Sequence, residues 1–215
     1  MTITNAVELI RQQFPEYGDT QILQELDLSQ KIFANETKLG RKKFDSTSVT
    51  LLSEGDVEIV FDGSNVVYSV TTDVLGLVMN LTELKISQVE KVFFMDAQNT
   101  ILSDILMWDY IDNILHFYNG TNTPLTVFPP EIKKMVMVGI IKPNNITTLG
   151  SMFTIPEEFH YAVIADILKR FLAIKGALES AAFWSAEYSR YRVNAKRYSN
   201  ESMGANYIAL SELGV

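Results

Sequence analysis

The sequence has no cysteine and only two histidines among its 215 residues. Without thiols, neither a disulfide nor a cysteine-ligated metal can stabilise the fold. The histidines are His116 and His160, and the spacing from Glu157 to His160 is the Glu-x-x-His spacing of di-iron helical bundles. Such a site needs two of these motifs and two further carboxylates, and the sequence offers one motif. We therefore expect no metal and no cofactor, and we interpret His160 as a surface or capping residue.

Long apolar runs and basic residues are also scarce. The longest apolar runs, such as Met135–Ile141, are much shorter than the roughly 20 residues that span a bilayer. Because no basic segment followed by an apolar segment stands near Met1, we expect neither a signal peptide nor membrane association. Lys and Arg total 18 against 26 Asp and Glu, which gives a net charge of −8 and disfavours tight binding to a phosphate backbone.

No recognised catalytic motif is present. The sequence lacks the glycine-rich nucleotide-binding loops, the Gly-x-Ser-x-Gly elbow and the His-Glu-x-x-His zinc motif. Asp104, Asp109 and Asp112 cluster near Trp108, but they lack the glycine-containing register of a calcium loop. We interpret them as solvated loop acids. The sequence predicts no catalytic residues and a protein that is not an enzyme.

The apolar content, 47% of the residues, indicates an ordinary folded chain, and its periodicity changes twice. Spacings of three and four predict one helix from Thr4 or Asn5 to Phe14 and another from Thr20 to about Lys38. Pro156–Tyr198 has one internal glycine, Gly176, and predicts a helical hairpin or one long bent helix. Between these regions we expect strands over residues 49–51, 57–61, 66–70, 86–95, 114–118 and 135–141, whereas 102–111 is ambiguous between strand and helix.

This order predicts an α+β fold in which the N- and C-terminal helices form a bundle, with an inserted antiparallel β region and an extended C-terminal arm. The expected divisions are N-terminal helices over 1–42, a β-rich insert over 43–150, long C-terminal helices over 151–198, and the arm over 199–215.

The last helix interleaves aromatic and basic side chains, which are Tyr188, Arg190, Tyr191, Arg192, Lys196, Arg197 and Tyr198. Such a pattern can stack bases and follow phosphates. It is also typical of a helix that packs its aromatic face and leaves its charges in water, the interpretation we favour. A third interpretation is an interface with an acidic partner, because Tyr and Arg concentrate binding energy.

The residue pattern of four segments resembles the head–tail connector, or adaptor, proteins of tailed bacteriophages, including the tail tubular A type. The segments are Asp19–Thr37 (DTQILQELDLSQKIFANET), Ile114–Pro143 (ILHFYNG…MVMVGIIKP), Ile155–Gly176 (IPEEFHYAVIADILKRFLAIKG) and Ala177–Arg197 (ALESAAFWSAEYSRYRVNAKR). Residues 43–112 have no counterpart in this resemblance.

The resemblance implies a structural virion protein at the head–tail junction, made in the host cytoplasm. About twelve copies would form a homo-oligomeric ring. The portal protein would lie above it, a tail or second-ring protein below it, and DNA would pass through the ring without specific binding. The family has no catalytic or cofactor residues. The alternatives are another tail component, such as a tail terminator, tube or second-ring protein, and a binding module unrelated to phages.

Combining the aromatic–basic helix with this resemblance, we expect five residues to contact neighbouring copies or the portal: Trp184, Tyr188, Arg190, Tyr191 and Arg197.

Overall fold

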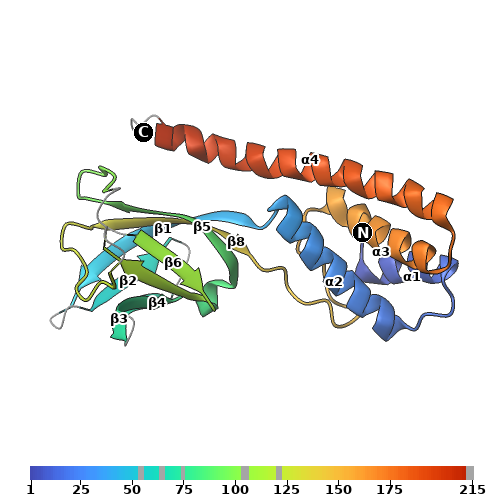
Figure 1. The fold of residues 1–215 in the computed structure, drawn as a ribbon, viewed down its shortest axis with the longest axis horizontal. Coiled ribbons are helices and arrows are strands. Elements are labelled where there is room, and N and C mark those ends of the chain that lie inside the picture. Colours follow the sequence, from blue (N-terminus) through green and yellow to red (C-terminus); the bar gives the residue numbers. More distant parts are fainter. Residues whose placement is uncertain (53–55, 63–65, 74–75, 103–106, 120–122, 212–215) are drawn as a thin grey trace. The chain divides into compact units, whose positions relative to one another are not determined.

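The protein is described by a computed structural model, shown in Figure 1. It describes residues 1–52, 56–62, 66–73, 76–102, 107–119 and 123–211, with the backbone alone at 73 and over 202–211. The chain forms two compact units. The helical unit combines Met1–Gly40 with Lys142–Val215, and the sheet unit is Arg41–Ile141.

Four α-helices and a short 3-10 turn make up the helical unit, in the order α1 (Ile3–Gln13), α2 (Asp19–Thr37), η2 (Glu157–Phe159), α3 (His160–Ile174) and α4 (Leu178–Ser211). The Thr2 hydroxyl caps α1 by accepting a hydrogen bond from the Asn5 N–H. Gly176 has φ +75°, a left-handed conformation that suits glycine, and it allows the chain to turn between α3 and α4. Of the two predicted alternatives, a helical hairpin and one long bent helix, the hairpin is confirmed.

Helix α3 is at the centre of this unit. All residues from Ala162 to Leu168 are buried, so α3 is covered around its whole circumference rather than along one stripe. Aromatic rings join it to its neighbours. Phe14, at the end of α1, meets Phe171 edge to face at 5.3 Å, and Phe33 of α2 lies 6.1 Å from Phe159.

The sheet unit contains eight strands: β1 (Arg41–Leu51), β2 (Val57–Phe61), β3 (Val67–Asp73), β4 (Gly76–Asn80), β5 (Ile86–Met95), β6 (Met107–Ile111), β7 (Ile114–Tyr118) and β8 (Lys134–Ile141). They form one antiparallel sheet in the order β5-β8-β1-β2-β3-β4-β7-β6. The edge strands β5 and β6 are joined by the Tyr110 hydroxyl, which donates to the Ile86 carbonyl at 2.9 Å. The sheet therefore curls into a nearly closed barrel.

The inside of the barrel is an aromatic core. Phe94, Phe117 and Phe128 meet edge to face in all three pairs, with centroids 5.9–6.3 Å apart. Gly76 begins β4 with φ +104°, and a Cβ at this position would lie 2.7 Å from the Pro124 Cβ. A glycine is thus required where the segment around Pro124 crosses the start of β4.

The predicted fold class, a helical bundle with an inserted β region and an extended arm, is wrong. The protein is an α+β protein with four α-helices and an eight-stranded, nearly closed antiparallel sheet that has its own core. The expected arm is absent up to Ser211, because α4 continues to that residue. Ser199, where the arm should begin, is buried and donates through its hydroxyl to the Lys38 carbonyl at 2.8 Å.

Several local predictions are confirmed. The strands over 86–95 and 114–118 have the bounds of β5 and β7, and 107–111, within the ambiguous segment, is a strand. Strand β4 was not predicted, and α1 and α2 begin slightly earlier than expected. Lys38, in the left-handed conformation, is the C-cap of α2.

Candidate protein-interaction surface

Helix α4 carries two rows of residues with spacings of three and four, on opposite sides. The inner row faces the core of the helical unit and consists of Ala181, Trp184, Tyr188, Tyr191, Ala195 and Tyr198. Ala181, Tyr188 and Ala195 are buried, and Trp184 and Tyr191 pack against the core. The ring of Tyr198 meets Phe159 edge to face at 5.6 Å. We call this row the inner seam, because it joins α4 to its own unit.

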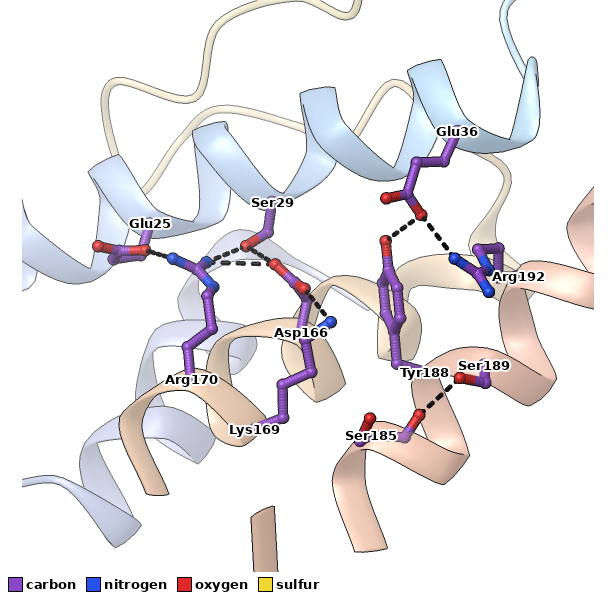
Figure 2. Close-up of polar contacts among 10 residues, drawn as sticks. All are labelled: Glu25, Ser29, Glu36, Asp166, Lys169, Arg170, Ser185, Tyr188, Ser189 and Arg192. Atoms are coloured by element: carbon purple, nitrogen blue, oxygen red, sulfur yellow. Dashed lines mark hydrogen bonds and ion pairs between the residues drawn. The ribbon is translucent and has the colours of Figure 1, made fainter. Parts of the chain in front are cut away.

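Tyr188 contacts two other helices, and Figure 2 shows its hydroxyl pointing at Glu36. Its hydroxyl donates to Glu36 Oε2 of α2 at 2.9 Å, and its ring meets Phe33 edge to face at 5.7 Å. The Lys169 ammonium of α3 lies 3.8 Å from the ring centroid, a cation–π contact. Burial, and then the bond to Glu36, raise the pKa of the Tyr188 hydroxyl well above its usual value. Tyr188 thus links three helices.

A buried carboxylate fixes α2 against α3 beside this tyrosine (Figure 2). Asp166 of α3 accepts a hydrogen bond from Ser29 of α2 at 2.8 Å and pairs with Lys169 at 2.8 Å and Arg170 at 3.2 Å. Arg170 also reaches Glu25 of α2 at 2.5 Å. The buried charge is therefore compensated by two cations and a hydroxyl, as burial of a carboxylate requires.

The outer row of α4 points away from this core. Its members are Phe183, Ala186, Arg190, Val193 and Arg197, which repeat at intervals of three and four. All five are exposed, and Phe183 and Val193 keep 59% and 56% of their surface accessible. We call this row the outer seam. It combines two exposed apolar side chains with two guanidinium groups.

The two guanidinium groups of the outer seam make their contacts at the protein surface. Arg190 pairs with Glu187 at 2.6 Å and lies 5.5 Å from the Tyr191 ring. Exposed pairs of this kind contribute at most about 1 kcal/mol, so Arg190 can exchange partners at small cost. Arg197 lines a shallow surface hollow together with Glu158 and Glu201.

The five residues expected at an interface thus divide between the two sides of α4. Arg190 and Arg197 are on the outer seam, Trp184 and Tyr191 are partly buried against the core, and Tyr188 is buried. In this structure Tyr188 has almost no surface to offer a partner.

Sequence reasoning missed Phe183 and Val193. The signal that could have found them is the second run of spacings of three and four, at 183, 186, 190, 193 and 197, which lies on the side of the helix opposite the tyrosines.

A second surface feature of the helical unit is a groove of about 590 Å³ between α1 and the start of α3. Its lining residues are Met1, Asn5, Glu8, Leu9, Gln12, Glu157 and Tyr161. Tyr161 is 52% exposed and Leu9 is 36% exposed, so the groove presents apolar surface beside two carboxylates. The N-terminal ammonium contacts Glu157 Oε1 at 2.5 Å and lowers the pKa of that carboxyl. We call this feature the acidic groove.

The sheet unit has an open depression of about 640 Å³ on its outer face, along β3 and β4. Its lining is apolar or uncharged apart from Glu83. The aspartates singled out in the sequence lie elsewhere in this unit. Asp109 is on β6 opposite His116 of β7, Asp112 is in the turn between these strands, and Asp104 lies outside the described residues.

Of the two interpretations of His160, surface or capping residue, the first is wrong, and the residue is the C-cap of η2. His160 is buried, its Nε2 lies 3.0 Å from the Ile155 carbonyl, and its ring packs 4.4 Å from the Phe153 ring. Burial lowers its pKa. Within the described residues, no three His, Asp or Glu side chains are grouped so that they could hold a metal ion.

No helix in the described part of the chain combines the length and apolar character needed to cross a membrane. A scan against protein-family models and a search of curated proteins gave no match for this chain.

Proposed function

We propose that this protein is a structural subunit of a homo-oligomeric ring, the adaptor between the portal and the tail of a tailed bacteriophage. The observation that carries the assembly role is the outer seam of α4, where Phe183 and Val193 are exposed on a helix whose other side is fixed by the core. Large exposed apolar side chains on a rigid element are typical of interaction surfaces, and Arg is enriched there.

The resemblance of segments such as Ile155–Gly176 and Ala177–Arg197 to phage connectors supplies the rest of the proposal. The partners are about twelve copies in a ring, the portal above and a tail or second-ring protein below. The location is the virion. The net charge of −8 supports this role, because an acidic wall does not retain DNA that passes through the ring.

The test has two parts. Electron microscopy and mass photometry of the purified chain, alone and with the portal protein encoded in the same genome, should detect closed rings with a central opening. Particles that remain monomeric in both preparations would contradict the proposal.

Variants then locate the contact. We expect Phe183→Ala combined with Arg197→Ala, both on the outer seam, to remove ring formation while the circular dichroism spectrum remains that of the wild type. Unchanged rings would exclude the outer seam from the assembly.

A further inference from the structure

Resting on the proposed function, we infer that neighbouring copies meet head to tail: the outer seam of α4 in one copy binds the acidic groove of the next copy. The occupant of the seam is thus a second copy of this chain. Three features of the two surfaces favour this contact: their charges, the exposed apolar groups that each presents, and their positions on different elements.

The two surfaces are complementary in charge. From Ser189 to Asn200, α4 has four basic residues and no acidic residue. Two of the four, Arg190 and Arg197, are on the outer seam. The acidic groove offers Glu8 and Glu157, and Glu8 makes no ion pair within the described residues. Since Glu157 already contacts the N-terminal ammonium, Glu8 is the main carboxylate available to a guanidinium from a second copy.

The apolar groups also match. Phe183 and Val193 project from the seam, and Leu9 and Tyr161 line the groove with part of their surface exposed. Docking would remove all four from water at once. An interface with apolar groups at its centre and charges at its rim has the usual anatomy of a specific contact.

Pairing of two outer seams with each other is disfavoured. In either direction it would bring the row of Arg190 and Arg197 against the same row of its partner. The carboxylates nearest to this row, Glu187 and Glu201, already lie beside Arg190 and Arg197 of their own copy. The groove contains no residue of α4, so a seam–groove contact uses two different surfaces of each copy. Such a heterologous contact continues from copy to copy and closes into a ring when the rotation allows.

Charge reversal tests the contact. The assembly constant of the wild type, Arg190→Glu with Arg197→Glu, and Lys196→Glu would be measured by analytical ultracentrifugation. We expect the double variant to associate roughly tenfold more weakly or worse. Lys196→Glu is the matched control, because Lys196 is exposed on the same helix but outside the seam. Glu8→Lys added to the double variant should restore association.

The absence of cysteine allows a direct test of the arrangement. A chain with Val193→Cys and Leu9→Cys should form a ladder of disulfide-linked species larger than dimers under mild oxidation. Val193→Cys alone should not form a covalent dimer. Lys196→Cys with Leu9→Cys is the matched control and should give little ladder.

The outcomes separate this inference from the proposed function. Rings that survive the double charge reversal, with no ladder from the cysteine pair, overturn the seam–groove contact and leave the ring role intact. A covalent dimer from Val193→Cys alone also overturns it, because two seams would then meet. A wild-type chain that never associates, with or without the portal protein, removes both the contact and the proposed function.

Discussion

The two sides of α4 have the same spacing but different composition. The inner seam places aromatic and small residues, including Tyr188 and Ala195, against α2 and α3, whereas the outer seam places Phe183 and Val193 between arginines. Spacings of three and four show that one side of a helix can pack against another surface. The residue types on that side, and whether another helix of the same chain covers it, show whether that surface is internal or belongs to another molecule. Matched substitutions on the two sides of α4 therefore distinguish an internal partner from an external one.

Truncating one aromatic ring on each side should give the largest difference. Tyr188→Ala leaves a cavity beside Phe33 and should lower the free energy of unfolding of the helical unit by about 3 kcal/mol or more. Phe183→Ala removes a ring that is 59% exposed and meets Trp184 edge to face at 5.4 Å, and it should lower this free energy by at most about 1 kcal/mol.

The two tryptophans allow this measurement within one unit. Trp184 is in the helical unit and Trp108 in the sheet unit, so a Trp108→Phe background isolates the fluorescence of the helical unit during urea unfolding. Equal losses for Tyr188→Ala and Phe183→Ala would show that both rings are packed and would contradict the division of α4 into inner and outer seams.

Enlarging an alanine on each side should give an intermediate difference. Ala195 is fully buried, so Ala195→Leu forces extra methylenes into a packed core and should destabilise the helical unit by about 1–3 kcal/mol. Ala186→Leu should have almost no effect on stability, because Ala186 is exposed and leucine is nearly as good a helix former as alanine. Urea unfolding of both variants in the Trp108→Phe background is the test, and a similar loss at both positions would contradict it.

Sequence patterns predicted local elements better than their assembly. The strands at 86–95 and 114–118 were found because apolar side chains recur along them, whereas Gly76–Asn80 was missed because its short apolar run shows no clear alternation. The pairing of β8 between β5 and β1 joins strands distant in sequence, which periodicity within a segment does not encode. The prediction of an extended arm was wrong, because polar residues such as Ser199 and Asn200 can continue a helix where no proline interrupts it.

The candidate surface was only partly predictable for a related reason. Trp184, Tyr188, Arg190, Tyr191 and Arg197 all lie on one helix, as expected, and the favoured interpretation of a packed aromatic face is confirmed for Trp184, Tyr188 and Tyr191. The local sequence does not contain the packing partners of that face, which lie far along the chain. Glu36, which accepts the Tyr188 hydroxyl, is 152 positions away. The aromatic residues noticed in the sequence thus belong to the inner seam, whereas the exposed apolar residues Phe183 and Val193 are on the outer seam.

The smallest expected effect concerns a single hydroxyl of the inner seam. Tyr188→Phe keeps the ring and removes the hydrogen bond to Glu36, which should cost about 1 kcal/mol at neutral pH. The cost should depend on pH.

The folded state raises the pKa of Tyr188 above the ordinary value of 10.0, because burial and Glu36 favour the neutral hydroxyl. This contribution to stability is complete below pH 10.0 and is lost as the pH rises above it, since the unfolded tyrosine then ionises. The difference in free energy of unfolding between wild type and Tyr188→Phe should therefore shrink from neutral pH to about pH 11. The other tyrosines are common to both proteins and cancel in this difference. A constant gap would mean that the Tyr188 hydroxyl is not shielded by α2, and the inner seam would then be more open than its packing indicates.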